Sequence, residues 1–257
     1  MKNWNKPERI VFLLSITIAA VFGSTQNVSA MHIMEGYLPL AFCILWGLIC
    51  LPFLTAGYIN IRRNVRKKRR TLILYAMSGA FIFVISSLKI PSVTGSCSHM
   101  TGTGLSAILF GVTSTSILGI IVLIFQALLL AHGGLTTLGA NTFSMAIAGP
   151  IIAFLIYRLG MKLKWNRLVT IFFAAMLGDF MTYCITSIQL ALAYPDSTGG
   201  LSVSLVKFLA VFAPTQIPLA IMEGILTVLI FMGLQTYAAP ELRDLGIITE
   251  DTRHVEK

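Results

Sequence analysis

The chain has 257 residues, of which 56% are hydrophobic and only 11% are charged, and its mean hydropathy is +0.84. A soluble domain carries about 25% charged residues, so this composition excludes an ordinary water-soluble fold and predicts a protein embedded in the lipid bilayer. The formal net charge of +9 does not indicate a nucleic-acid partner, because seven of the 19 Lys and Arg residues lie in the run RRNVRKKRR at 62–70. Beside apolar segments, such a run is typical of a cytoplasmic loop.

Residues 1–30 are predicted to be a secretory signal peptide. A basic start is followed by the apolar stretch IVFLLSITIAAVF at 10–22, and Val28 and Ala30 occupy the positions that a signal peptidase reads. The apolar stretch is short against the roughly 20 residues that a spanning helix needs. We therefore expect cleavage after Ala30, which leaves Met31 as the first residue outside the cytoplasm. An uncleaved anchor helix and a translation start at Met31 are the alternatives.

The rest of the chain predicts an all-α, polytopic membrane protein with seven transmembrane helices at 31–236 and a cytoplasmic tail at 237–257. The apolar stretch at 105–131 is interrupted by GVTSTS at 111–116 and is too short for two full spans, so it predicts two short or tilted helices. Basic residues gather in alternate loops, which places these loops inside and the mature N-terminus outside. The expected apolar segments are 38–60, 71–90, 105–131, 142–160, 168–193 and 203–236.

Histidines are rare in this chain, and three of the four map to the outer side of the predicted bundle. These are His32, His99 and His132, whereas His254 falls in the charged tail. Loop histidines are often merely exposed, so solvent exposure and a metal or ligand site are both open. The low number of polar groups elsewhere gives a site as much weight as exposure.

His32 gains a special chemistry if the chain begins at Met31. The free α-amine of Met31, the backbone nitrogen of His32 and its imidazole Nδ1 can surround one metal ion through a five-membered and a six-membered ring. His99, on a Gly-rich loop, could supply a fourth nitrogen. Four nitrogens in a plane suit Ni(II) or Cu(II), and Co(II) is accepted if the protein imposes the geometry. These nitrogens must be deprotonated, so binding should weaken in acid.

Further polar residues have roles that the sequence leaves open. Asn141 is a candidate to orient a ligating imidazole, and His132 is a candidate ligand. Asp179 and Glu223 fall within apolar segments, where acidic residues are costly and usually functional or paired. They could line an ion path or tie helices together. Cys97 is a further possible ligand, although a thiolate would oppose release of the ion.

Four stretches resemble a known family of transporters. They are MHIMEGYLP at 31–39, GSCSHMTGTGL at 95–105, LLLAHGGLTTLGANTFSMAIAGP at 128–150, and the pair Gly178-Asp179. Together they resemble the substrate-binding subunit of cobalt and nickel energy-coupling-factor importers, the CbiM/NikM family. The resemblance covers the chain from 31 to about 236.

This resemblance implies a seven-helix membrane bundle that binds Co(II) or Ni(II) through Met31, His32 and His99. It implies four partner chains: a transmembrane coupling protein, two cytoplasmic ATPases and a small auxiliary membrane subunit. The whole chain is most similar to the cobalamin-linked branch, so we expect cobalt as the transported ion and nickel as the alternative. Met100 departs from the family pattern, in which Pro follows the loop histidine.

Two other classes of protein were weighed against a transporter subunit. The chain has no P-loop GxxxxGK[ST], so we expect no ATP site, no enzymatic activity and energy supplied by partners. An intramembrane hydrolase is suggested by GLSA at 104–107, with Ser106 as nucleophile and His132 as base, but close helix packing explains Gly102, Gly104 and Ser106 equally well. A receptor or assembly scaffold predicts no metal in the purified protein.

Overall fold

The structure, a computed structural model, describes residues 32–91 and 97–248 of the chain. The predicted signal peptide at 1–30, Met31 and His254 lie outside these residues. The described part is helical apart from its connecting loops and one antiparallel pairing of two-residue strands, β1 (Ile90–Pro91) and β2 (Cys97–Ser98). The prediction of an all-α protein is confirmed.

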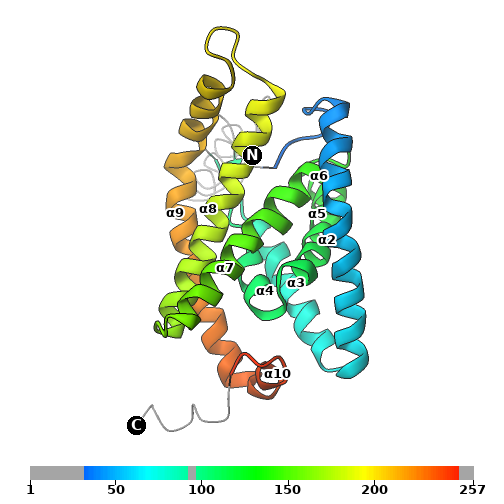
Figure 1. Cartoon of the computed structure of the whole chain (residues 1–257), viewed down its shortest axis with the longest axis vertical. Helices are drawn as coiled ribbons and strands as arrows, with labels where there is room; N and C mark the ends of the chain where they lie inside the picture. Colours follow the sequence, from blue (N-terminus) through cyan, green and yellow to red (C-terminus); the bar gives the residue numbers. More distant parts are fainter. Residues whose placement is uncertain (1–31, 92–96, 249–257) are drawn as a thin grey trace, which may run out of the picture.

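The helices pack side by side as a bundle that is longer than it is wide (Figure 1). Five described segments are long and apolar enough to cross a membrane, and α3 is a shorter apolar helix. The chain is therefore a multi-pass membrane protein. The bounds are α2 Leu40–Lys67, α3 Thr71–Ser87, α4 Thr103–Phe110, α5 Val112–Leu130, α6 Leu138–Asn141, the π-helix η1 Thr142–Ala148, α7 Gly149–Lys162, α8 Arg167–Ala193, α9 Gly200–Tyr237 and α10 Ala239–Asp244.

The first span is longer than predicted, because α2 continues through most of the basic run. Arg and Lys are good helix formers, and Arg66 and Lys67 in the last turn lie at the negative end of the helix dipole. The predicted loop at 62–70 is thus mainly the end of a helix, followed by a tight turn into α3. The second span ends at Ser87, slightly before the predicted 90.

The apolar stretch at 105–131 is interrupted at a single residue. Gly111 adopts φ 80° and ψ 169° between α4 and α5, a conformation that favours glycine. The predicted break at 111–116 was too long. Thr115 and Ser116 are helical and donate their hydroxyls to backbone carbonyls of Gly111 and Thr113, so these polar residues are satisfied within the helix.

α4 is a buried half-helix in the middle of the bundle. Its eight residues rise about 12 Å, well under the ~30 Å of the hydrocarbon core. A Cβ at Gly104 would lie 2.8 Å from the Cα of Ala175, so only glycine allows α4 to approach α8 this closely. The start of α4 therefore lies inside the bundle, and the loop that carries His99 must dip into the bundle to reach it.

The segment HGGLTTLGAN was predicted as a loop through 141, but helical structure begins at Leu138. α6 runs without interruption through η1 into α7, and the three form one candidate span from Leu138 to Lys162. Gly139 is tolerated here because it packs against α2: a Cβ on it would lie 2.5 Å from the backbone nitrogen of Gly47. The π-helical turn follows Asn141 directly, and such turns are frequent at functional sites.

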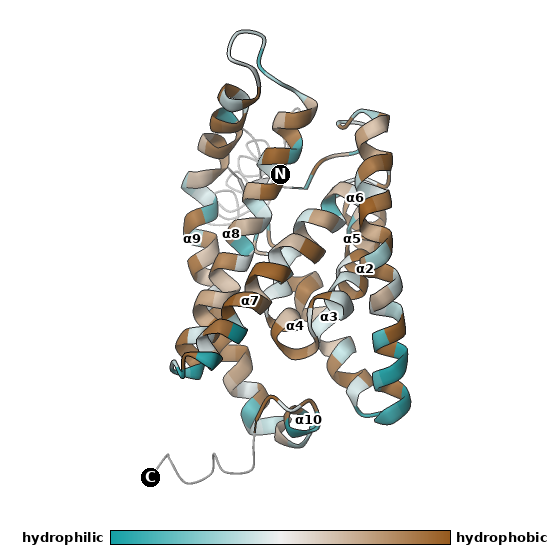
Figure 2. Ribbon diagram, in the orientation of Figure 1, coloured by the Kyte–Doolittle hydropathy of each residue, from teal (hydrophilic) through white to brown (hydrophobic). Residues whose placement is uncertain are grey.

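Hydrophilic residues collect towards one end of the bundle, at the end of α2 and on α10, whereas the middle is apolar (Figure 2). The beginning of the predicted tail is folded onto this end. Leu242 and Ile248 are buried in a cluster that includes Leu74, and Lys68 forms an ion pair with Asp244. Residues 239–248, which the sequence assigned to the tail at 237–257, are therefore packed against this end of the bundle.

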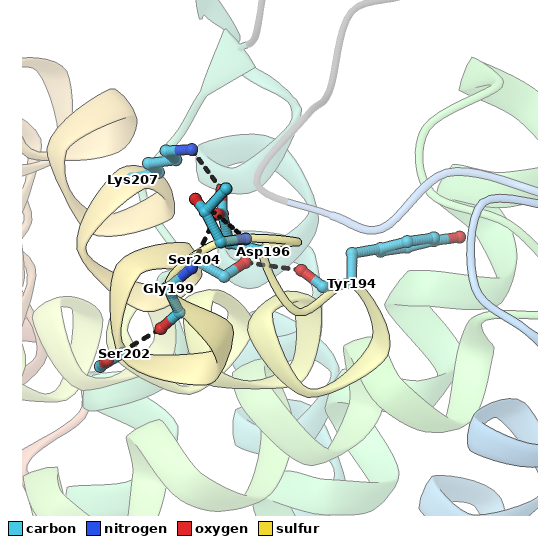
Figure 3. Close-up of polar contacts among 7 residues, drawn as sticks. Tyr194, Asp196, Gly199, Ser202, Ser204 and Lys207 are labelled. Carbon is cyan, nitrogen blue, oxygen red and sulfur yellow. Dashed lines mark hydrogen bonds and ion pairs between the residues drawn. The ribbon is translucent and has the colours of Figure 1, made fainter.

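The predicted loop at 194–200 joins α8 to α9 at the opposite end (Figure 1). Its polar contacts are drawn in Figure 3. Asp196 Oδ1 accepts hydrogen bonds from Thr198 and from the backbone nitrogen of Gly199, and Lys207 forms an ion pair with the same carboxylate. These bonds hold the pKa of Asp196 below its usual value. Polar groups of the loop and of α9 thereby fix this connection between helices of 27 and 38 residues.

Candidate metal centre

The residues before α2 lie against the segment that follows α5, and hydrogen bonds hold them there. Asn141 and Ile33 form a pair of bonds: Ile33 N donates to Asn141 Oδ1 at 2.8 Å, and Asn141 Nδ2 donates to Ile33 O at 3.0 Å. Thr137 Oγ1 also donates to Ile33 O, at 2.6 Å. We call residues 33–36 the strap. Asn141 was expected to orient an imidazole; it orients the backbone next to His32 instead.

Two glycines allow the strap to lie so close. A Cβ at Gly134 would lie 2.5 Å from the Cα of Glu35, and a Cβ at Gly133 would meet Asn141 and His32 at 3.1 and 3.5 Å. Gly133 also has φ +76°, which other residues rarely adopt. The pair of glycines in HGGLTT therefore lets two backbones approach in front of the histidines.

His132 turns inward at the end of α5. Ala131 adopts the left-handed conformation with φ 46°, and the backbone nitrogen of His132 donates to Gln126 O at 3.1 Å. A left-handed residue after the last helical turn reverses the chain. The side chain of His132 is consequently buried at 2% exposure, although a histidine in a loop is usually exposed.

The three outer histidines meet in one buried cluster. His32 and His99 have ring centroids 4.4 Å apart, His32 and His132 4.6 Å, and His99 and His132 4.9 Å. One ligand nitrogen from each lies within 4.8 Å of the others. Among the residues that the structure describes, this is the one group of His, Cys, Asp and Glu side chains with the spacing of a metal site.

The hydrogen bond of His99 fixes which nitrogen faces the centre. His99 Nδ1 lies 2.8 Å from Met100 O, and a carbonyl only accepts, so Nδ1 carries the proton and Nε2 presents its lone pair. Nε2 lies 3.0 Å from His32 Nδ1. With metal–nitrogen bonds of about 2.1 Å, two nitrogens at right angles lie about 3.0 Å apart. The pair therefore has the spacing of neighbouring ligands on one ion, and a proton bridges it when no ion is bound.

The centre keeps its imidazoles neutral. Burial lowers the pKa of His99 to about 4 and that of His132 to about 2, and it lowers the pKa of His32 well below its usual value. In His32 and His132, the neighbouring imidazoles act in the same direction. His132 Nε2 is buried without a hydrogen-bond partner. Neutral imidazoles are the form that binds metal, so the site presents lone pairs at pH 7.

Two of the predicted ligands, His32 and His99, are thus placed together, and Met31 lies outside the described residues. His132, which sequence reasoning left undecided, joins them. The sequence feature that could have indicated this role is the position of His132, directly after an apolar helix and before two glycines. For Cys97 the structure describes only the backbone, which pairs with Pro91.

Asp179 and Glu223 tie α8 and α9 to the loop that carries His99. Glu223 accepts hydrogen bonds from the backbone nitrogen of Thr101 at 2.6 Å and from its hydroxyl at 2.9 Å. Gln216 Nε2 donates to Asp179 Oδ2 at 2.6 Å and lies 3.4 Å from His99 O. The sequence left two roles open for these acidic residues, an ion path and a link between helices. The contacts show the link between helices.

Ser106 does not form a hydrolase site with His132. Its hydroxyl is buried and pairs with the hydroxyl of Thr115 at 3.0 Å. The glycines of the same motif serve close approach, as Gly104 does against Ala175 and Gly102 does with a Cβ position 3.2 Å from the Cα of Ile82. Close packing through small residues therefore explains GLSA.

We expect Asn141→Ala to loosen the strap and weaken metal binding. The substitution leaves the buried N–H of Ile33 without a partner, which costs about 1–3 kcal/mol of stability, and it frees the backbone beside His32. The affinity for Co(II), measured by calorimetric titration, should fall by about 10- to 100-fold, as for loss of an outer-shell partner. Asn60→Ala, which removes the exposed bond of Asn60 to Thr113, is the matched control. Equal affinities in the two variants would contradict this role.

Comparisons with known proteins identify the family of the chain. The family model of CbiM, described as a cobalt uptake substrate-specific transmembrane region, matches residues 32–242. A cobalt transport protein CbiM of Lachnoclostridium phytofermentans is 66% identical over 244 residues, which cover 95% of this chain and 98% of the relative. A second, of Ruminiclostridium cellulolyticum, is 52% identical over 248 residues, 96% of this chain and 100% of the relative.

Two solved structures share the fold. A crystal structure of a transition metal transporter is 30% identical with a TM-score of 0.69, and the match covers 80% of this chain and 92% of that one. A truncated transition metal transporter is 28% identical with the same TM-score, over 80% and 99% of the two chains. The family match, the relatives and the helical membrane fold agree: the chain belongs to the CbiM family of cobalt uptake substrate-specific transmembrane proteins.

Proposed function

We propose that the chain is the substrate-binding subunit of an energy-coupling-factor importer that captures Co(II) outside the cell for cobalamin biosynthesis. The observation that carries this proposal is the convergence of His32, His99 and His132, buried and neutral, with ligand nitrogens within 4.8 Å of one another. The relatives named as cobalt transport proteins support cobalt as the ion.

In this proposal the ion is held by nitrogen donors. Met31 contributes its α-amine, His32 its backbone nitrogen and Nδ1, and His99 its Nε2. His132 Nε2, which is buried without a partner, is a further donor that can approach the same ion. Four nitrogens in a plane also suit Ni(II), so nickel import by the same architecture is the second candidate.

The topology that we propose has seven membrane helices within 31–236, after removal of residues 1–30. Six of them cross the bilayer: α2, α3, α5, the continuous α6–η1–α7, α8 and α9. The seventh is the half-helix α4, which reaches only part of the way before α5 begins. The basic end of α2 and the turn after α7 carry Arg and Lys residues, which favours the cytoplasmic side for this end. The histidines and the mature N-terminus then face outward, and 237–257 faces the cytoplasm.

Transport requires energy that this chain is not expected to supply. The resemblance to energy-coupling-factor importers supports four partners, namely a transmembrane coupling protein, two cytoplasmic ATPases and a small auxiliary membrane subunit. ATP hydrolysis would take place on the ATPases. The chain's own part is to bind the ion and present it.

Metal analysis tests the proposal directly. The protein is purified after growth with equal Co(II) and Ni(II), its metal content is measured, and its N-terminus is sequenced. We expect one cobalt ion per chain and an N-terminus at Met31. Nickel in place of cobalt would favour the second candidate, and a protein without either ion would contradict the proposal in favour of a receptor or scaffold.

A further inference from the structure

Two acidic side chains, one on α8 and one on α9, are buried inside the membrane part of the bundle. Asp179 and Glu223 are 1% and 0% exposed. The Glu223 oxygens accept bonds from Thr101, and Asp179 Oδ2 accepts one from Gln216, which also lies 3.4 Å from His99 O. Asp179 Oδ1 and Gln216 Oε1 are both buried without a hydrogen-bond partner.

These side chains bring together several oxygen acceptors, and two of them lack a hydrogen-bond donor. A buried carboxylate is costly in an apolar surrounding unless a proton or a cation neutralises it. Packing alone does not require Asp179, since its neighbours leave one of its oxygens unpaired at a cost.

The oxygens lie on a buried polar line that leads away from the histidines. Gln216, Glu223 and Thr227 on α9 are spaced seven and four residues apart, which places them on one face of the helix, and all three are 0% exposed. Gln216 contacts His99 O at one end of this line. Thr227 Oγ1 is buried without a partner towards the other end, where the helix continues to Tyr237.

We propose that Asp179, Glu223 and Gln216 Oε1 form a second, oxygen-lined site for a divalent cation, which the ion occupies after it leaves the histidines. The inference rests on the proposed function. Carboxylate and amide oxygens suit harder divalent ions such as Mn(II), whereas imidazoles suit later transition metals. An intermediate site must bind well enough to receive the ion and weakly enough to release it, and oxygen donors meet both conditions for Co(II).

Mn(II) is the probe that separates the two sites. Mn(II) binding to the purified full chain is followed by the electron paramagnetic resonance signal of free Mn(II). We expect one saturable Mn(II) site in the wild type and in His99→Ala. Asp179→Asn should weaken Mn(II) binding by at least about 10-fold. Loss of an outer-shell partner already costs that much in metal affinity, and this substitution removes a charged ligand. Asp196→Asn, in the loop between the same helices, is the matched control and should bind as the wild type does.

Two results would overturn this inference: no saturable Mn(II) binding in the wild type, or undiminished binding in either Asp179→Asn or Asp179→Ser. In both cases the carboxyl groups serve only to tie the helices. The wild-type measurement needs no variant, so it stays decisive even if a substituted chain folds poorly.

Co(II) separates this inference from the proposed function. Asp179→Asn should slow cobalt uptake by a larger factor than it lowers the calorimetric affinity of the histidine centre for Co(II), because Asp179 reaches that centre only indirectly, through Gln216. Unchanged uptake would remove the second site from the transport path. If the wild-type chain does not bind Co(II) at all, the proposed function is overturned. The Mn(II) measurement would still decide whether the oxygen-lined site binds a cation.

Discussion

His99→Ala should weaken Co(II) binding by more than about 100-fold, because loss of a ligand exceeds the 10- to 100-fold effect of losing an outer-shell partner. His99 is 0% exposed, its Nε2 lies 3.0 Å from His32 Nδ1, and its own Nδ1 is fixed on Met100 O. Alanine leaves the ion without this donor and opens a space in its place. Calorimetric titration of the purified protein with Co(II) measures the loss, and cobalt uptake by cells should fall with it.

The control for this experiment is His254→Ala, which removes the same side chain from the charged tail. We expect its affinity and uptake to equal those of the wild type. An undiminished affinity in His99→Ala would exclude His99 from the site, and it would leave the convergence of the three imidazoles without a role in binding.

One residue inserted between Ala30 and Met31 should abolish most cobalt uptake. The insertion moves His32 to the third position of the mature chain, so two backbone nitrogens now separate the α-amine from the imidazole. Amine, both backbone nitrogens and imidazole would fill four positions on the ion and leave none for His99. The α-amine would also no longer lie one residue before the side chain that Asn141 and the strap hold in place.

Uptake of radioactive cobalt measures this effect, and N-terminal sequencing must verify that the extended chain begins one residue early. The matched control is the same residue inserted in the tail after His254. Normal uptake by a correctly extended chain would exclude the amine of Met31 from the ligands, while the histidine centre could still bind through imidazoles alone.

Much of the fold could be predicted from the apolar pattern. The expected 168–193 is α8 to within one residue, and the break near 111 is present. Two of the errors share a cause, since glycine and threonine were taken as loop signals. Gly139 lies in a helix because it must pack on Gly47, and Thr115 stays helical because its hydroxyl bonds to a carbonyl within the helix. Such tertiary reasons are not visible in a window of sequence.

The site was predictable in part for a similar reason. The chelating geometry of His32 follows from covalent chemistry, and His99 followed from the resemblance and its Gly-rich loop. His132 stayed open because its burial depends on the left-handed turn at Ala131, a residue type with no preference for that conformation. The role of Asn141 was not predictable from local sequence, because it depends on a hydrogen bond with Ile33, 108 positions away.

The strap affects both binding and release of the ion. Its backbone bonds to Asn141 and Thr137 order the first residues during folding, so little ordering entropy remains to be lost when the ion arrives. Because of the same bonds, His32 would move together with α6. A small shift of α6 relative to α9, which anchors His99 through Gln216, would move the nitrogens of His32 away from His99 as one group. A single sliding movement between the helices would thus divide the donor set of the ion and leave it held by fewer nitrogens.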